Sequence, residues 1–396
     1  MRVRSLPLGP VIVASMIACT REVPPPAAPS AEFIIAAADS AFWVRSDEQG
    51  IRVRGAPMVV AQVGGRFAEV YVADEDRSYY DAVYVGQRLL KRDLITGDSM
   101  SLFADTLMPV LARAYAAANP DERPLSSDEE GYENPRTVAT AEVMVLDVLG
   151  PWLSYEYRTD INVIGGPSSH GSRRGVVDLR TGVSATLDAL FGAATALQVT
   201  SRGREQWRVI LDSLRLAIDG QGEDVRAELD RLTFDPHSFI IGVEDREPRV
   251  RFSIAQSAGR NAGGSHELEG IPVDEPAWWA DVRQAYPIEE GPDERLWPRE
   301  HFTLVARNAS ARSAFALRDG AGTEWRLGSV PSPVLRVMWL EDSLAPGTRT
   351  ALTRAFNESA FYSEDVRIVK LFERRARPRP VPVMQVRHAS AMERAP

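Results

Sequence analysis

The stretch "WLSYEYRTDINVIGGPSSHGSRRGVVDLRTGVSATLDALFG", residues 152–192, decides the predicted fold. Its first part has the two-residue period of a strand, and Tyr155 and Tyr157, two residues apart, therefore fall on one face of that strand. A loop rich in glycine and serine separates it from a second strand, which ends in a turn at Thr181 and Gly182. Two strands joined in this way form an antiparallel hairpin, and apolar residues beyond the turn lead toward a helix. This order predicts an α+β unit.

The same signals extend outward from the hairpin. Apolar residues recur at helical spacing over 203–219, and a second helix is expected over 225–232. Hairpin signals outnumber the spacings typical of β-α-β units. We therefore expect an α+β fold of antiparallel β-sheets with helices packed on one side, in two to three subdomains. The expected parts are a β-rich N-terminal domain at 33–125, an α+β domain at 140–287 and a C-terminal α+β segment at 296–372.

The central hairpin and its flanks carry a recognisable set of residues. Two glycines precede a histidine, the second strand closes in Asp-Leu-x-Thr-Gly, and Leu-x-x-Leu-Phe follows. These residues are Gly165, Gly166, His170, Asp178, Leu179, Thr181, Gly182, Leu187, Leu190 and Phe191. In this pattern residues 140–287 resemble the extracytoplasmic domain of lysozyme-sensing anti-sigma factors, which is related to a domain of some peptidoglycan deacetylases. The strands expected over 239–275 resemble the closing strands of that family.

The resemblance implies an extracytoplasmic module that binds a protein or a cell-wall ligand. Two departures limit what it implies. The loop between Gly166 and His170 is longer than in the family, and we find neither a sigma-binding segment nor a deacetylase domain. Signalling across a membrane and deacetylation are therefore not expected from the resemblance, whereas ligand binding is.

The N-terminus has the plan of a bacterial lipoprotein signal peptide. Two arginines precede an apolar run that ends in Met16-Ile17-Ala18-Cys19, which resembles a lipobox. We predict a signal peptide at 1–18, lipidation of Cys19 and a Pro/Ala tether at 19–32, with a disordered basic tail at 373–396. The protein would be extracytoplasmic and attached to a membrane through its lipid anchor. In a Gram-negative cell, Thr20 after the cysteine predicts the periplasmic side of the outer membrane.

Composition excludes some functions. The formal net charge is -9, so a nucleic-acid partner is not expected, because phosphate binding needs a basic face. No G-x-S-x-G, H-E-x-x-H, Walker A or paired C-x-x-C motif is present. The five histidines lie too far apart in sequence for a metal-binding motif. We expect no cofactor and no metal site, and the sequence favours a non-enzyme without settling the question.

The candidate binding residues all lie on or beside the central loop. They are Tyr155, Tyr157, His170, Arg173 and Arg174. The tyrosines offer large, rigid contact surfaces, and the arginines suit the carboxylates of a peptide, a glycan or an acidic partner. The loop glycines permit unusual backbone conformations. We expect a ligand to meet this loop or an exposed strand edge beside it, the alternative being an ordinary surface hairpin.

Three functions remain open at this point. The first is a lipid-anchored, non-catalytic binding module of the cell envelope. The second is an envelope hydrolase with an unrecognised site, in which His170 lies within hydrogen-bond reach of a carboxylate. The third is a structural scaffold of the envelope that binds no small ligand.

Overall fold

The structure is a computed structural model. It describes residues 29–37, 40–47, 50–126, 129–131, 133–166, 168–217, 232–255, 265–291, 293–309, 312–330, 335–340, 344–358 and 362–366. The predicted signal peptide, Cys19, most of the predicted tether, residues 225–231 of the second predicted helix and the predicted tail lie outside the described residues. No helix in the described part is both long enough and apolar enough to cross a membrane.

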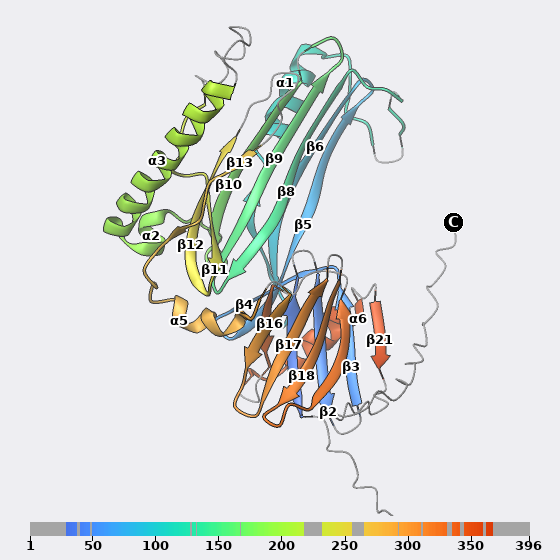
Figure 1. The fold of residues 1–396 in the computed structure, drawn as a ribbon. Helices are drawn as coiled ribbons and strands as arrows, with labels where there is room; N and C mark the ends of the chain where they lie inside the picture. Colours follow the sequence, from blue (N-terminus) through green and yellow to red (C-terminus); the bar gives the residue numbers. More distant parts are fainter. Residues whose placement is uncertain are drawn as a thin grey trace, which may run out of the picture.

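Two five-stranded sheets pack face to face and form what we call the base sandwich (Figure 1). The first has the order β20-β1-β2-β3-β21, with bounds β1 (Ala31–Ala36), β2 (Ala41–Asp47), β3 (Gly50–Ala56), β20 (Arg336–Trp339) and β21 (Tyr362–Val366). The second runs in chain order, with β15 (Ile288–Glu289), β16 (Glu294–Pro298), β17 (Phe302–Ala309), β18 (Arg312–Asp319) and β19 (Glu324–Val330). Alternate residues of β1 explain the layering. Phe33 and Ile35 face the second sheet, whereas Ile34 faces α6 (Thr348–Glu358) on the other side.

A seven-stranded sheet, which we call the long sheet, rises from the base sandwich (Figure 1). Its order is β10-β9-β8-β6-β5-β4, and β7 pairs with β6. The bounds are β4 (Val59–Val63), β5 (Arg66–Tyr79), β6 (Ala82–Asp93), β7 (Ser99–Ala104), β8 (Thr137–Leu149), β9 (Trp152–Val163) and β10 (Ser169–Asp178). Only β6 and β8 are parallel among its described pairs, and α1 (Leu107–Ala118) lies between them in sequence.

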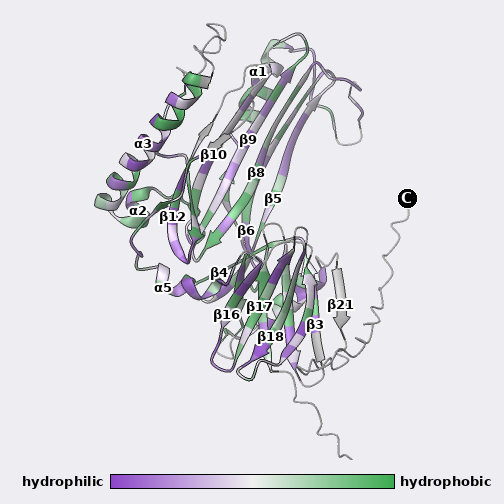
Figure 2. Ribbon diagram, in the orientation of Figure 1, coloured by the Kyte–Doolittle hydropathy of each residue, from purple (hydrophilic) through white to green (hydrophobic). Residues whose placement is uncertain are grey.

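The helix α1 packs on one face of the long sheet, and a four-stranded sheet with further helices packs on the opposite face. The strands are β11 (Phe239–Glu244), β12 (Glu247–Ala255), β13 (Ser265–Glu267) and β14 (Ile271–Pro272). The helices are α2 (Leu187–Phe191), α3 (Ala193–Ala217), α5 (Trp279–Val282) and the 3-10 turn η1 (Arg283–Ala285). Their shared core includes Trp152 and Val176 of the long sheet with Phe252 of β12. One face of α3 packs into this core, and Figure 2 shows hydrophilic and hydrophobic segments alternating along the helix. Its residues Leu197, Val209 and Leu216 are exposed.

The predicted α+β class with mainly antiparallel sheets is confirmed. The helix α6 covers one face of the first base sheet, but α1 and α3 lie toward opposite faces of the long sheet. The strands also combine across the predicted ranges. β1 pairs with β20, so the range 296–372 shares a sheet with the N-terminal range. β6 pairs with β8, so the long sheet spans the predicted boundary between 125 and 140.

Candidate functional site

The hairpin of β9 and β10 holds all five predicted binding residues. The strands meet at a turn that includes Gly165, whose φ of 82° suits glycine. His170 is the second residue of β10 and pairs with Asp160, so it lies in a strand and not in the loop. The predicted residues therefore divide between the two faces of the hairpin, because side chains alternate along a strand. Tyr155, Tyr157 and Arg173 lie on one face, whereas His170 and Arg174 lie on the other.

The first face is aromatic. Tyr155 is only 4% exposed, and its ring centroid lies 5.1 Å from that of Phe103 on β7. Tyr157 is half-buried beside the same ring. The exposed guanidinium of Arg173 lies over the rings of Tyr157 and Phe103. Its Cζ is 5.6 Å from the Tyr157 ring centroid and 5.8 Å from that of Phe103. Tyr155 is thus a core residue, and Arg173 supplies the accessible charge.

Asp105 anchors this aromatic face to α1. Its carboxylate accepts hydrogen bonds from the backbone N–H groups of Leu107 and Met108, each at 2.9 Å, and so caps the helix. It also accepts a hydrogen bond from the Tyr157 hydroxyl. Burial, together with this hydrogen bond and the nearby negative charge, raises the pKa of Tyr157 well above its usual value. Tyr157 is therefore a neutral donor that holds the strand to the helix.

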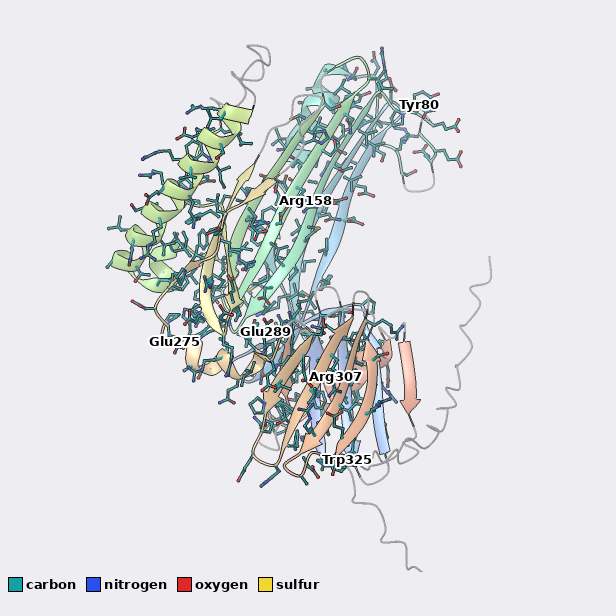
Figure 3. All side chains as sticks on the ribbon, viewed as in Figure 1. Tyr80, Arg158, Glu275, Glu289, Arg307 and Trp325 are labelled. Carbon is teal, nitrogen blue, oxygen red and sulfur yellow. The ribbon has the colours of Figure 1, made fainter. Side chains whose placement is uncertain are left out.

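The opposite face of the hairpin is ionic and is organised by Glu156. The Glu156 side chain is only 2% exposed and accepts from Arg158 Nε at 2.6 Å and Ser172 Oγ at 3.1 Å. Arg174 Nε lies 3.2 Å from Glu156 Oε2 and is the third partner of this carboxylate. Burial alone would raise the pKa of Glu156, but the hydrogen bond from Arg158 and the arginine charges outweigh it and lower that pKa. Arg158 is labelled on the long sheet in Figure 3.

Arg174 is a structural link rather than an accessible ligand contact. Its side chain is buried, and its Nη1 lies 3.4 Å from Glu267 Oε1 on β13. Glu267 in turn lies 3.5 Å from Arg251 Nη1 on β12. A chain of ion pairs therefore joins β10 to the four-stranded sheet that covers this face.

His170 occupies the exposed end of the ionic face. Its Nδ1 lies 3.3 Å from Asp160 Oδ1, and the two side chains are 44% and 46% exposed. Asp160 also accepts from Asn162 Nδ2 at 2.7 Å. The pair lies on an open strand surface, and among the described residues no hydroxyl donates to His170. This geometry orients an imidazole for hydrogen bonding but assembles no nucleophile beside it.

The backbone of β10 is paired on one side only near His170. Even-numbered residues direct their backbone groups away from β9: Arg174 N–H donates to Ser238 Oγ at 3.0 Å, and Val176 C=O accepts from Ala185 at 2.7 Å. By the two-residue period, the groups of His170 and Ser172 point the same way. No strand pairs with these two residues among those the structure describes. Among the described residues, the outer edge of β10 from Ser169 to Ser172 is therefore unpaired.

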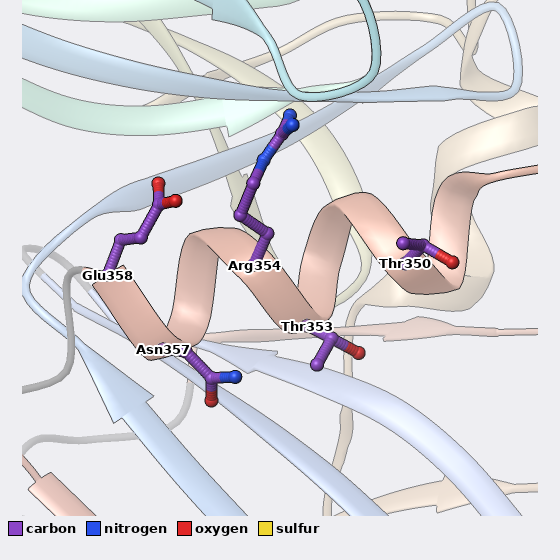
Figure 4. A pocket seen from close by; sticks show the side chains of 5 residues that line it. All are labelled: Thr350, Thr353, Arg354, Asn357 and Glu358. Atoms are coloured by element: carbon purple, nitrogen blue, oxygen red, sulfur yellow. The ribbon is translucent and has the colours of Figure 1, made fainter.

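Outside the hairpin, neither a metal cluster nor a reactive pocket forms among the described residues. Within the described residues, no three His, Cys, Asp or Glu side chains gather as metal ligands. A shallow surface pocket of about 490 Å³ lies along α6 and is lined by Thr350, Thr353, Arg354, Asn357 and Glu358 (Figure 4). Arg354 donates to the Leu94 carbonyl at 2.9 Å, and Asn357 accepts from Arg54. These hydrogen bonds hold α6 in place. The residues that line the pocket do not form a set of catalytic groups.

Comparison with known proteins adds little. No protein-family model and no curated protein matches this sequence. Among solved structures, the chain is similar to a member of the DUF3298 family from Bacteroides fragilis, with 12% identity and a TM-score of 0.24. That match covers 51% of this chain and 90% of the other. A TM-score this low supports no conclusion about fold or activity.

Proposed function

We propose that this protein is a lipid-anchored, non-catalytic binding module of the cell envelope that holds its ligand at the free edge of β10. The backbone groups of His170 and Ser172 carry the proposal, because they face outward and have no partner in the described part of the chain. An extended polypeptide can add to such an edge, with main-chain hydrogen bonds supplying affinity and flanking side chains supplying specificity. The lipobox-like end at Cys19 and the resemblance to anti-sigma and deacetylase ectodomains support an envelope location.

The side chains beside the edge define the ligand. Arg173 is exposed on the aromatic face and suits a carboxylate, while His170 and Asp160 offer polar partners on the ionic face. A segment of an envelope protein with an acidic residue fits this edge best, because regular strand pairing requires an ordinary peptide backbone.

Photo-crosslinking in cells tests the proposal. A photoreactive p-benzoylphenylalanine replaces Ser169, the exposed first residue of β10, in the full chain. The control places it at His301, which is 82% exposed on the base sandwich. We expect crosslinked envelope protein from position 169 and not from 301. Equal products from both positions, or none from position 169, would argue against the β10 edge, and the latter would favour a scaffold.

A matched pair of substitutions separates backbone pairing from side-chain contact. His170→Ala keeps the outward N–H, whereas His170→Pro removes it. Proline is tolerated near the start of an edge strand, and equal melting temperatures would confirm that both variants fold. We expect crosslinking from position 169 to persist in the alanine background and to fall at least several-fold in the proline background. Similar yields in the two backgrounds would exclude strand addition.

A hydrolase is the second candidate, because His170 lies beside Asp160. Its test is the release of soluble fragments from purified peptidoglycan sacculi by the wild-type protein and by His170→Ala. Release that depends on His170 would establish catalysis and contradict the proposal above. We expect no release from either protein.

A further inference from the structure

The opposite edge of the long sheet, on β5, is also free and has a different character. β4 pairs with β5 only between Arg66 and Val70, and the backbone N–H of Leu125 bonds to the Ser78 carbonyl at 2.8 Å. Between these two contacts, no strand pairs with the outer side of β5 among the described residues. Figure 1 shows β5 at the margin of the sheet. In the part of the chain that the structure describes, this free edge runs from Val72 to Arg77.

The direction of the backbone groups follows from the contacts at each end. Ser78 directs its carbonyl outward to Leu125, whereas Phe67 directs its carbonyl inward to Leu94, next to β6. Even-numbered residues of β5 therefore point outward, and β5 pairs with β6 without a register shift. Val72, Asp74 and Asp76 thus present N–H and C=O groups to an incoming strand.

Three consecutive acidic residues mark this edge. Asp74 and Asp76 lie on one face of β5, and Glu75 lies on the other. Gln87 donates to Asp74 at 2.8 Å, and Arg88 lies 3.0 Å from Glu75, both from β6. Asp76 is exposed and forms no ion pair with another described residue. Figure 2 colours this part of β5 hydrophilic.

Charge limits what can occupy the edge. Like charges directly opposite each other destabilise a pair of strands, so pairing with the same edge of a second copy is disfavoured. Charged edge residues often serve only to prevent aggregation. However, opposite charges across a strand pair are favourable, and an arginine or lysine opposite Asp74 or Asp76 would form such pairs. The exposed Val72 at one end adds an apolar contact.

We propose that the β5 edge from Val72 to Arg77 accepts an extended, basic segment of a partner protein as an added antiparallel strand. The partner carries arginine or lysine at alternate positions opposite Asp74 and Asp76. This site lies at the other end of the long sheet from the β10 edge and selects the opposite charge.

A synthetic peptide tests the proposal directly. The probe is an acetylated, fluorescently labelled Val-Arg-Val-Arg-Thr-Arg-Thr, titrated with the full chain and followed by fluorescence anisotropy. A second peptide of the same sequence carries N-methyl groups on alternate residues, which keeps every charge but removes strand hydrogen bonds. We expect the unmodified peptide to bind roughly tenfold more tightly. Equal affinity would mean simple charge attraction and would overturn the proposal, as would no binding at millimolar concentration.

Paired variants locate the site. Asp74→Asn with Asp76→Asn should weaken the peptide by roughly tenfold, because two favourable cross-strand charge pairs are lost. The control, Asp245→Asn with Glu300→Gln, removes two exposed charges elsewhere and should leave the affinity unchanged. His170→Pro should also leave it unchanged, which separates this site from the β10 edge. An unchanged affinity in the β5 variant, or self-association that this variant abolishes, would overturn the proposal.

Discussion

Arg336 of the base sandwich is bonded to Asp147 of the long sheet, with Nη1 3.2 Å from Oδ1. Arg336 is only 6% exposed and also donates to the carbonyls of Val148, at 3.1 Å, and Val60, at 2.8 Å. The Tyr286 hydroxyl donates to the same Val148 carbonyl at 2.9 Å. Burial raises the pKa of Asp147, and the charge of Arg336 opposes that rise. One buried arginine therefore joins the two halves of the molecule.

Removing that arginine should weaken the joint. Arg336→Ala leaves the Asp147 carboxylate without its buried charge partner and the Val60 carbonyl without its donor from Arg336. Breaking a buried ion pair in this way should cost about 3–5 kcal/mol of unfolding free energy. Because Arg336 bridges two sheets, thermal unfolding followed by circular dichroism should also split into two transitions. The control is Arg307→Ala on the base sandwich, whose ion pairs with Glu294 and Glu324 are exposed (Figure 3). It should cost less than about 1 kcal/mol. Equal losses would mean that the joint does not depend on Arg336.

Gly175 should tolerate no side chain. A Cβ at this position would lie 2.6 Å from the Tyr155 ring, so Gly175→Ala must displace a buried aromatic residue. Overpacking of this kind costs about 1–3 kcal/mol and should lower the melting temperature by several degrees. Gly242→Ala in β11 is the matched control, because a Cβ there would meet nothing within 4 Å. A control loss as large as that of Gly175→Ala would contradict the packing argument.

The sequence predicted the local part of this fold well and its long-range part poorly. The hairpin of β9 and β10 follows from alternation and turn residues that lie close together, such as Gly165 and Gly182, both with positive φ. The pairing of β1 with β20 joins residues about 300 positions apart, and no local signal encodes it. Strand ranges were therefore predicted, but their grouping into sheets was not.

The candidate site shows the same limit. His170, Arg173 and the tyrosines were predicted from residue type, but alternation places them on opposite faces once β10 extends to Ser169. Glu156 lies between the two tyrosines, and its role depends on the register that sets it opposite Arg174. Asp105 could have been recognised as a helix cap, because it lies just before an apolar helix. Its bond to Tyr157 could not, because 52 residues separate them.

Stability in acid should depend on Glu156. Its pKa is lowered from the usual 4.5 in the folded protein, so its stabilising contribution is complete above that value and is lost as the pH falls below it. Glu156→Gln should lower the melting temperature at pH 7 because Arg174 then lacks its buried partner. The variant should also lose less stability than the wild type between pH 5 and pH 3. Parallel curves over that range would show that Glu156 does not titrate on unfolding.

The bond between Asp105 and Tyr157 should couple α1 to the hairpin. Asp105→Ala removes the helix cap and the acceptor for the tyrosine and should cost about 1–2 kcal/mol or more. Tyr157→Phe removes only the hydroxyl and should cost about 1 kcal/mol. The double variant should cost less than the sum, because both substitutions remove the same hydrogen bond. Additive losses in urea denaturation would mean that the two side chains act independently.

The predicted lipid anchor can be tested at Cys19. Cys19→Ser keeps the size of the side chain, but a hydroxyl cannot replace the thiol that would receive the diacylglyceryl group. We expect the wild-type protein to enter the detergent phase of a Triton X-114 partition, because two or three acyl chains bury many methylene groups at about 0.8 kcal/mol each. The serine variant should stay in the aqueous phase or persist as an uncleaved precursor of higher mass. Equal partitioning of two correctly cleaved proteins would disprove lipidation.

In a Gram-negative host, the residue after the cysteine gives a second test: with Thr20 the protein should fractionate with the outer membrane, and Thr20→Asp should move it to the inner membrane.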